Sequence, residues 1–325
     1  MARIAITDGM AKEAIEILHK NGHEVIEKHY SEEELLSGAL KDFDAIVVRS
    51  ATKLTKEVIM ASKSDDRGIV FIGRAGVGVD NIDLETASGN GITVCNTPQS
   101  STQSVVELTI GHLLASVRHI ATGDRKLRDG VWAKKDLRGT ELSGKNLGLI
   151  GYGRIAQGVG KVASALGMNL HCYDPYLPKD IARMNNCVIH DDVDDVFKMC
   201  THISIHCNFS EETHHLVNNK RIIMMPKIGD DGIKCGRHII NCARGGIVDE
   251  KAIGEALENG ELTTAGLDVF EVEPPMDSNL LQYEQFHGTP HIGAATIEAQ
   301  RRIGEEMILL LSDYFEGKIP HSKLN

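Results

Sequence analysis

The chain has 325 residues, of which 42% are hydrophobic and 4% aromatic, and its formal net charge is −11. This length predicts two domains or one large one, and the apolar content is sufficient for a packed core, which argues against disorder. No block of Lys and Arg stands out against the acidic balance, so nucleic acid and anionic membranes are disfavoured as main partners.

Short apolar segments alternate with segments of helical periodicity along the first part of the chain, which is typical of a parallel sheet built from βαβ units. We expect strands at 3–6, 45–48, 69–72 and 92–94, and helices that include 10–21 and 80–89. After Pro98, apolar residues recur at helical spacing and predict a long helix. These residues are Val106, Ile110, Leu113 and Val117.

A polar stretch at 123–145, which contains the only tryptophan, Trp132, is predicted to be a linker or arm. A second run of strands and helices follows it. Its strands are expected at 146–150, 169–173, 202–206, 238–242 and 264–268, and a short extended piece is expected before TPHIGAAT, 289–296. The last segment predicts a helix that packs on the first domain, because one helical face carries Ile303, Met307, Leu310, Leu311 and Tyr314. Two open α/β domains imply a cleft near the carboxyl ends of their strands.

Targeting and metal-binding signals are missing from the sequence. The N-terminal segment MARIAITDGM has no apolar signal core, and no apolar run approaches the about 18 residues of a membrane helix, so we expect a cytoplasmic protein. Seven cysteines without a CxxC pair predict reduced, buried thiols. No spacing of a known metal site accompanies the histidines, so no metal is expected at His202, His206, His214 or His215.

The segment NLGLIGYGRIAQGVGKVASALGMNLHCYDPY, 146–176, has the pattern of a dinucleotide-binding turn. An apolar strand leads into Gly151, which permits a tight turn, and Gly153, which leaves room for a pyrophosphate. Ala156 lets the next helix pack closely on the strand, and the helix N-terminus offers N–H groups to phosphate. Asp174, at the end of the next strand, can bind both ribose hydroxyls and would repel a 2′-phosphate. The pattern therefore predicts NAD, in preference to NADP.

A second glycine-rich turn, GRAGVGVDNID at 73–83, also lies between an expected strand and a helix. The strand after it ends in Asn96 and carries no acid, so this turn is a poor dinucleotide site. Its N–H groups can form a nest for a smaller anion such as a carboxylate, but an ordinary turn explains the pattern equally well.

Three chemically reactive side chains follow expected strand ends, namely Arg244 in NCARGGIVDE, Glu273 in VFEVEPP and His291 in TPHIG. Arg244 is either a solvated loop charge or a group that binds an anion. On these residues alone, a loop acid and a surface histidine are the simpler interpretations of Glu273 and His291.

A family resemblance changes that balance. The chain resembles the D-isomer-specific 2-hydroxyacid dehydrogenases, most of all their phosphoglycerate branch, over nearly its whole length and in the expected order. The matching stretches are VVRSATKLT (47–55), RAGVGVDNIDLETA (74–87), NTPQSSTQSVVELTIG (96–111), GTELSGKNLGLIGYGRIA (139–156), YDPY (173–176), NCARGGIVDE (241–250), AGLDVFEVEPP (265–275) and TPHIGAAT (289–296).

The resemblance implies catalytic roles for the three side chains. Arg244 would bind the carboxylate and carbonyl of the substrate, and His291, paired with Glu273, would transfer the hydroxyl proton. Physical chemistry agrees, because a neutral histidine accepts a proton near pH 7 and a carboxylate fixes its ring orientation. The planar, permanent charge of arginine suits a carboxylate better than that of lysine.

The resemblance also implies two doubly wound parallel-sheet domains and their contacts. A Rossmann NAD domain, 101–294, would be inserted into a flavodoxin-like substrate domain, 1–100 with 295–325. Asp268 and the Cys242–Ala243 backbone would hold the nicotinamide carboxamide. The other implied cofactor contacts are Gly151, Gly153, Arg154, Ile155 and Asp174. The implied substrate contacts are Val77 and Gly78 for the carboxylate, Arg49 and Arg74 for a phosphate, and Arg138 or Lys135 for the site of a neighbouring subunit.

Each of these basic residues is alternatively an ordinary solvated charge. The family further implies a homodimer formed through the cofactor domain, with the arm 117–145 crossing over. The chain stops soon after the return helix, so serine feedback through a C-terminal regulatory domain is not expected.

Three departures from the family pattern bear on the site. Ser101 stands where many relatives have Asn, which would alter a substrate contact. The segment after the strand at 202–206 continues with Cys207 and Asn208 instead of the usual HxP, beside the expected adenine site. Extra residues at 229–237 predict a longer surface loop.

The sequence therefore predicts a 2-hydroxyacid dehydrogenase that transfers a hydride between 3-phosphoglycerate and NAD at the head of serine synthesis. Within the same family, a hydroxypyruvate, glyoxylate or D-lactate reductase is the alternative. An NADH-sensing binding protein resembling the corepressors of this fold is the alternative from another class, because such relatives can keep the Arg–Glu–His set.

Overall fold

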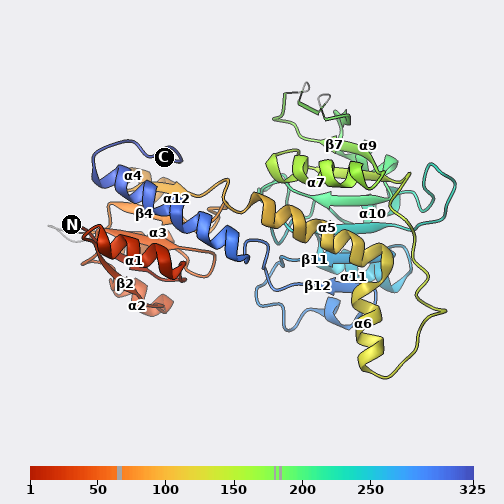
Figure 1. The fold of residues 1–325 in the computed structure, drawn as a ribbon, viewed down its shortest axis with the longest axis horizontal. Coiled ribbons are helices and arrows are strands. Elements are labelled where there is room, and N and C mark those ends of the chain that lie inside the picture. Colours follow the sequence, from red (N-terminus) through yellow and green to blue (C-terminus); the bar gives the residue numbers. More distant parts are fainter. Residues whose placement is uncertain (64–67, 179–180, 183–184) are drawn as a thin grey trace. The chain divides into compact units, whose positions relative to one another are not determined.

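The computed structural model describes residues 1–63, 68–178, 181–182 and 185–325. They form two compact units (Figure 1). Unit 1 comprises Met1–Ser101 and Ala294–Asn325, and unit 2 comprises Thr102–Gly293. The chain therefore leaves unit 1 to form unit 2 and returns to unit 1 for its last helix.

Unit 1 is built on a five-stranded sheet in which every strand pair is parallel, in the order β2-β1-β3-β4-β5. The strands are β1 Arg3–Ile6, β2 Glu24–Glu27, β3 Ala45–Val48, β4 Phe71–Arg74 and β5 Thr93–Asn96. The helices are α1 Lys12–Lys20, α2 Glu32–Leu36, α3 Lys56–Ala61, α4 Leu84–Gly89 and α12 Ile297–Phe315.

Both faces of this sheet are covered, because successive residues of its strands point to opposite sides. Ile4 and Ile6 of β1 lie in an apolar cluster with the residues of α1 and α12, whereas Ala5 lies in a second cluster with those of α2, α3 and α4. From α12, the cluster takes Ile303, Met307, Leu310 and Leu311, the apolar face expected from the sequence.

Unit 2 contains a seven-stranded sheet, also parallel at every strand pair, in the order β12-β11-β10-β9-β6-β7-β8. Its strands are β6 Asn146–Ile150, β7 Asn169–Tyr173, β8 Cys187–His190, β9 His202–Ile205, β10 His238–Asn241, β11 Thr264–Leu267 and β12 Phe286–Gly288. Its helices are α5 Thr102–Arg118, α6 Ile120–Arg128, α7 Arg154–Ala165, α9 Val193–Met199, α10 Asn219–Met224, α11 Glu250–Glu258 and the 3₁₀ helix η1 Asn279–Gln282.

The order of the strands reverses between β6 and β9. From β6 the chain builds outward through β7 to β8, then returns to β9 and builds the other way to β12. Open α/β sheets bind ligands at the carboxyl ends of the strands beside such a reversal. The expected fold, two doubly wound parallel-sheet domains, is confirmed.

Several helices of both units begin at residues whose side chains bond the first free N–H groups. Ser31 and Glu34 form a capping box at the start of α2. Asp83 caps α4 and Asp249 caps α11, each accepting a hydrogen bond from the main chain three residues on. The cap at Asp83 explains why α4 starts at Leu84, whereas the sequence predicted a helix from residue 80.

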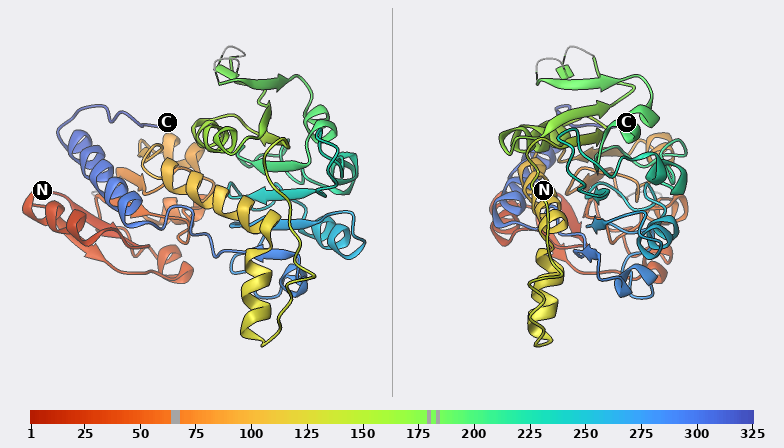
Figure 2. Two further views of the ribbon diagram at one scale, coloured as in Figure 1. Left: turned by 45° about the vertical axis from the view of Figure 1, so that its right-hand side comes forward. Right: turned by 90° about the vertical axis from the view of Figure 1, so that its right-hand side faces the viewer.

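The segment predicted as a linker or arm contains a helix. Helix α6, Ile120–Arg128, has no buried residue, and it protrudes from the rest of unit 2 with the following chain running back beside it (Figure 2). His119, with a φ of 54°, separates it from α5. Its polar sequence concealed the helix because no apolar stripe faces a core within this chain.

Two short strands were not predicted, β2 and β8. Each lies at the edge of its sheet and is partly exposed, so neither shows the continuous apolar run of a central strand. Among the described helices, none combines the length and the apolar character needed to cross a bilayer.

The cysteines and the extra residues at 229–237 behave as expected. All seven cysteines are free thiols and only Cys207 is partly exposed. The extra residues form a mostly exposed loop closed by a bridge between Ile228 and Lys234, and Lys145 forms an ion pair with Asp231 that ties the loop to the sheet.

Candidate active site

The glycine turn after β6 has the geometry predicted for it. Gly151 has a φ of 81°, and a Cβ there would lie 2.7 Å from the main-chain nitrogen of Cys207, so both conformation and space require glycine. At Gly153 a Cβ would meet no atom within 4 Å, so the N-terminus of α7 is open on that side. Arg154 and Ile155 form the first turn of α7, and Ala156 is buried against the sheet.

Asp174 lies beside this turn, one residue beyond β7. Its carboxylate accepts hydrogen bonds from the N–H groups of Tyr152, at 2.8 Å, and Tyr176, at 3.0 Å. The acid predicted from sequence spacing is thereby fixed at the carboxyl end of the sheet, next to the open start of α7. Sequence reasoning did not anticipate that it also holds the glycine turn in place.

The structure brings Glu273 and His291 together. The Nδ1 atom of His291 lies 2.8 Å from the Oε2 atom of Glu273, and both side chains are about one third exposed, at 35% each. The ring donates the proton on Nδ1 to the carboxylate of Glu273, which leaves Nε2 available for another group. These two residues follow the neighbouring strands β11 and β12.

The charges around Glu273 favour its ionised form. Burial raises the pKa of the Glu273 carboxyl, but the hydrogen bond and charge of His291, the N–H group of Phe270 and the charge of Arg244 outweigh it and lower the pKa below its ordinary value. Arg244 therefore acts electrostatically on the same carboxylate.

Arg244 follows β10, the strand next to β11. The side-chain amide of Asn241 donates to its carbonyl oxygen at 2.8 Å, and its own Nη1 atom donates to the carbonyl of Ala243 at 2.6 Å. The carbonyl of Ala243 thus orients the guanidinium. Cys242, which precedes Ala243, is buried.

Asp268 anchors the segment that carries His291. Its main-chain carbonyl accepts from the N–H of His291 at 2.9 Å, and its carboxylate accepts from those of Ile292, at 2.8 Å, and Gly293, at 2.9 Å. Burial raises the pKa of Asp268, although the hydrogen bonds to Thr289, Ile292 and Gly293 oppose that rise. A structural use of this carboxylate was not foreseen from the sequence.

In unit 1, the predicted substrate residues lie at the carboxyl ends of β3 and β4. Arg74 ends β4, and its Nη1 atom donates to the carbonyl of Ala75 at 3.0 Å. Arg49 follows β3. Among the residues that the structure describes, none forms a hydrogen bond or an ion pair with its guanidinium. Its N–H group donates to Asp8 at 2.7 Å.

The turn that carries Val77 and Gly78 is held by Asn96, which takes the position of the missing acid. The amide of Asn96 donates to the carbonyl of Val77 at 2.6 Å, so this residue fixes the turn. Ser101 is buried. Arg138 and Lys135 lie in unit 2, are exposed, and have no hydrogen bond or ion pair within the described ranges.

Similarity to known proteins agrees with this geometry. The family model described as D-isomer specific 2-hydroxyacid dehydrogenase, NAD binding domain, matches residues 110–293. The chain belongs to this family. The resemblance stated from sequence motifs and the expectation of NAD as cofactor are both confirmed.

Members of the family with different names are similar to this chain. A D-3-phosphoglycerate dehydrogenase from Methanocaldococcus jannaschii is 42% identical over 325 residues, which is all of this chain but 60% of that protein's length. A hydroxypyruvate reductase from Thermotoga maritima is 44% identical over 311 residues, 94% of this chain and 96% of that protein. A D-lactate dehydrogenase from Aquifex aeolicus, solved with NAD and lactic acid, has a TM-score of 0.83 at 27% identity, covering 97% of this chain and 96% of that one.

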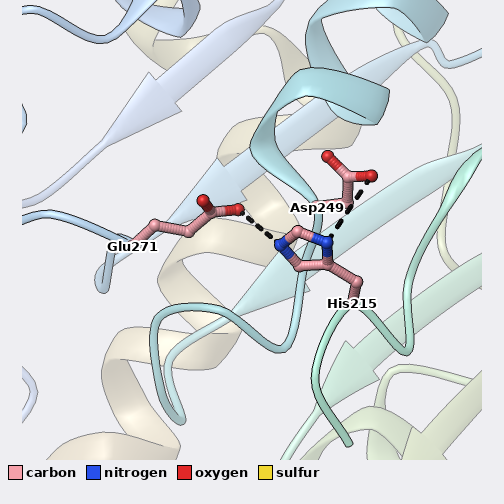
Figure 3. A group of neighbouring side chains, drawn as sticks. All are labelled: His215, Asp249 and Glu271. Carbon is pink, nitrogen blue, oxygen red and sulfur yellow. Dashed lines mark hydrogen bonds and ion pairs between the residues drawn. The ribbon is translucent and has the colours of Figure 1, made fainter.

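A second ionisable cluster in unit 2 lies close in sequence to Glu273. His215, Asp249 and Glu271 are the only three such residues, among those the structure describes, whose candidate ligand atoms lie within 4.8 Å of one another. Figure 3 shows the two carboxylates at opposite ring nitrogens: Glu271 is 3.0 Å from Nε2 and Asp249 is 3.9 Å from Nδ1. A metal ion would bind only one nitrogen of the ring, whereas here each nitrogen faces a different carboxylate. The arrangement therefore fits an imidazole that bridges two loops better than it fits a metal site.

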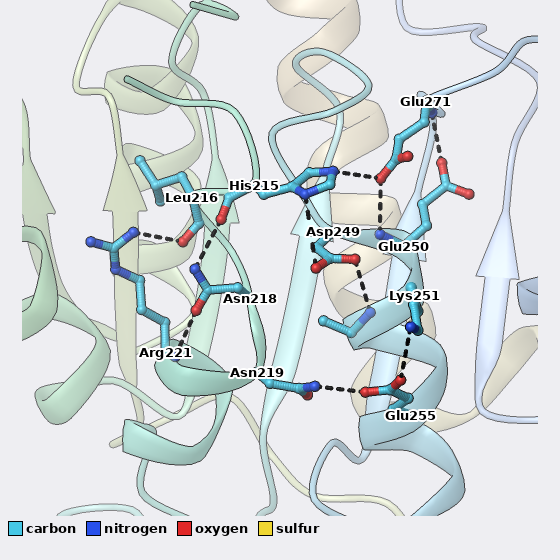
Figure 4. Close-up of polar contacts among 11 residues, drawn as sticks. His215, Leu216, Asn218, Asn219, Arg221, Asp249, Glu250, Lys251, Glu255 and Glu271 are labelled. Atoms are coloured by element: carbon cyan, nitrogen blue, oxygen red, sulfur yellow. Dashed lines mark hydrogen bonds and ion pairs between the residues drawn. The ribbon is translucent and has the colours of Figure 1, made fainter. Parts of the chain in front are cut away.

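The same cluster ties the Glu273 segment to the start of α11 (Figure 4). The carboxylate of Glu271 accepts from the N–H of Glu250 at 3.1 Å, and that of Glu250 accepts from the N–H of Glu271 at 2.6 Å. Ser278 donates to the other oxygen of Glu250 at 3.1 Å. The bonds of Glu271 hold the chain before Glu273, and the bond of Ser278 holds the chain after it. The acidic residues in the segments VDE (248–250) and VFE (269–271) could have indicated these bonds from the sequence.

Proposed function

We propose that this chain catalyses the NAD-dependent oxidation of a 2-hydroxy acid and its reverse. The observation that carries the proposal is the hydrogen bond of 2.8 Å between His291 and Glu273, with Arg244 after the adjoining strand. Membership of a dehydrogenase family supports it, and so does the glycine turn with Asp174 beside it.

When bound, NAD supplies the hydride acceptor. The C2–H bond of the substrate breaks with its electron pair, the hydroxyl loses its proton to Nε2 of His291, and a C2 carbonyl forms. Glu273 keeps the ring oriented and stabilises the imidazolium that results. Arg244 binds the substrate carboxylate and the developing carbonyl through its planar fork of N–H groups.

We place the cofactor along unit 2 in the following way. The open N-terminus of α7, with Gly151, Gly153, Arg154 and Ile155, takes the pyrophosphate. Asp174 binds the adenosine ribose. The carboxamide is assigned to Asp268 and to the backbone of Cys242 and Ala243.

We further propose 3-phosphoglycerate as the substrate, which makes the reaction the first step of serine synthesis. Val77 and Gly78 would offer N–H groups to the substrate carboxylate, and Arg49 and Arg74 would bind the phosphate. The similarity to the phosphoglycerate dehydrogenase of M. jannaschii supports this substrate. The hydroxypyruvate reductase of T. maritima, similar over almost its full length, supports the alternative that the chain reduces hydroxypyruvate.

A homodimer is part of the proposal. Helix α6 has no buried residue, and Trp132, after it, is 79% exposed. Ile120, Leu127 and Val131 are also exposed on this otherwise polar segment, and exposed apolar side chains of this kind support an interface with a second copy. On this proposal Arg138 lies in the arm and reaches the site of the second copy. Molar mass in solution for the wild-type chain and for Trp132→Ser tests it, with a monomeric wild type as the contradicting result.

The decisive experiment measures steady-state kcat/KM, from NADH absorbance, for 3-phosphoglycerate with NAD and for hydroxypyruvate, glyoxylate and pyruvate with NADH. D-Glycerate is the matched control, because it is the same acid without the phosphate. The variant Arg49→Gln should raise KM for 3-phosphoglycerate and leave glycerate unaffected, and Arg301→Gln, on the exposed surface of α12, serves as the control variant. Equal kcat/KM for the two acids would reject the phosphate assignment. Tight NADH binding with no turnover of any acid would instead identify an NADH-sensing protein.

A further inference from the structure

The conformation of His291 requires support from its surroundings. Its φ of 52° lies in the left-handed region, which a residue with a Cβ adopts only at a cost in free energy. Three successive N–H groups, those of His291, Ile292 and Gly293, bond to Asp268. The segment that carries the imidazole is therefore held by one buried residue, whose carboxylate accepts two of these three hydrogen bonds.

The carboxylate of Asp268 is connected by hydrogen bonds to two further side chains, those of Thr289 and His112. The hydroxyl of Thr289 donates to Oδ1 of Asp268 at 2.6 Å, and Nε2 of His112, on α5, lies 2.9 Å from the same hydroxyl. A threonine hydroxyl has a single proton, and that proton is given to the carboxylate. Nε2 of His112 must therefore carry a proton and donate it to Thr289. Both hydrogen bonds therefore run in one direction: His112 donates to Thr289, and Thr289 donates to Asp268.

The surroundings of His112 keep it in this one form. Its ring is 4% exposed and stacks on that of His287, with the centroids 5.1 Å apart, and Nε2 of His287 lies 3.2 Å from the carbonyl of His112. The Nδ1 atom of His112 has no hydrogen-bond partner among the described residues. Burial, assisted by His287, lowers the pKa of His112 to about 4. A neutral ring with its proton on Nε2 follows from both observations.

Building on the function proposed above, we propose that His112 and Thr289 are positioning residues for His291. Neither touches the substrate. Together they orient the carboxylate of Asp268, which in turn holds the residues on either side of the imidazole ring. Without them the strained conformation at His291 relaxes, and Nδ1 moves away from Glu273.

The first test compares Thr289→Val, which keeps the shape and removes the hydroxyl, with Thr289→Ser, which restores it. We expect kcat to fall on the order of 10- to 100-fold in the valine variant, since a misplacement of about 1 Å costs a catalytic group that much. The serine variant should recover most of the loss, and KM for NAD should change little in both. In the valine variant, the acid-side inflection of kcat/KM should move to lower pH, because the charged imidazole loses part of its carboxylate partner. A valine variant with the wild-type kcat and pH profile would overturn the proposal.

The second test separates positioning from general stability. His112→Leu is compared with His238→Leu, a histidine that is equally buried, stacks on His202 with centroids 4.5 Å apart, and bonds the hydroxyl of Thr264. His238 begins β10, at the opposite end of the sheet from His291. Both variants should unfold at lower temperature, but only His112→Leu should lose kcat per folded molecule. An equal loss of kcat in both would overturn the proposal.

A readout that needs no turnover keeps the inference separate from the proposed function. Hydrogen exchange at the N–H groups of Ile292 and Gly293 should accelerate in Thr289→Val and stay slow in Thr289→Ser. If the wild-type chain oxidises none of the acids, the proposed function fails, while this exchange measurement still tests the support of His291. Unchanged exchange in the valine variant would overturn the inference whatever the activity.

Discussion

The Nδ1 atom of His291 lies 2.8 Å from Oε2 of Glu273, across eighteen positions of sequence. Two adjacent parallel strands, β11 and β12, end at the same edge of the sheet, and the segments that follow them place the two residues side by side. The pairing therefore follows from the order of the strands, and it commits the ring to one orientation.

Replacing Glu273 by Gln tests the value of the negative charge in this pair. The amide can still accept a hydrogen bond from Nδ1, but it cannot stabilise an imidazolium, so we expect kcat to fall about 100-fold. NADH affinity, measured by fluorescence titration, should stay within about twofold of the wild type. A variant that keeps its full kcat would contradict the role of Glu273 in stabilising the imidazolium of His291.

Arg244→Lys tests the need for a planar cation. Lysine keeps the charge but offers a point donor in place of a fork, so we expect kcat/KM for the hydroxy acid to fall about 100-fold. Exposed Arg301→Lys is the control, because its ion pair with Glu305 is a surface contact. If both variants behave as the wild type, Arg244 does not bind the substrate.

Gly151 and Gly153 form a matched pair in one turn. Gly151→Ala should destabilise the fold by about 2 kcal/mol or more, because the left-handed conformation is strained for alanine and its Cβ would lie 2.7 Å from backbone. Gly153→Ala should fold normally, since its Cβ meets no atom within 4 Å, but it should weaken NADH binding by filling the space of the pyrophosphate. Denaturant unfolding and NADH titration separate the two effects, and the reverse pattern would refute the placement of the cofactor.

Three buried histidines predict a loss of stability in mild acid. Burial lowers the pKa of His112, His238 and His287 to about 4 in the folded chain, against about 6.5 when unfolded. Because the unfolded state binds more protons in this window, stability is present above pH 6.5 and decreases as pH falls toward 4. Each ring contributes on the order of 1 to 3 kcal/mol.

Denaturant midpoints at steps between pH 7 and pH 4 give the check on that prediction. Replacing His238 by Leu should flatten the pH dependence as well as lower the midpoint at pH 7. A midpoint that is constant across the range would show that these rings titrate normally.

Local pattern was enough to predict the nucleotide turn. Gly151, Gly153 and Asp174 lie within a single strand–helix–strand unit, and each residue type answers a steric or electrostatic need that can be stated without coordinates. The alternation of buried strands and amphipathic helices likewise predicted both sheets, because a parallel sheet covered on two faces leaves a strong apolar signal.

The supports of the site could not be predicted in the same way. His112 was counted only as part of a helix with an apolar face, because its partner Thr289 is 177 residues away. The positive φ of His291 has no sequence signal, since histidine is not a residue that turns require. Helix α6 escaped prediction because none of its residues is buried and its contacts with the chain, those of Thr122 and Arg125 with the carbonyl of Glu284, are polar.

The return of the chain to unit 1 has a consequence during synthesis. One face of the sheet formed by β1 to β5 is completed only by Ile303, Met307 and their neighbours on α12, and these residues are made after all of unit 2. A ribosome-bound chain must therefore leave Phe71 and the strand faces beside it uncovered while about 190 further residues emerge, which at about 5–20 residues per second is of the order of ten seconds or more. During that interval the apolar side chains of this half-covered sheet stay exposed to aggregation or to binding by a chaperone.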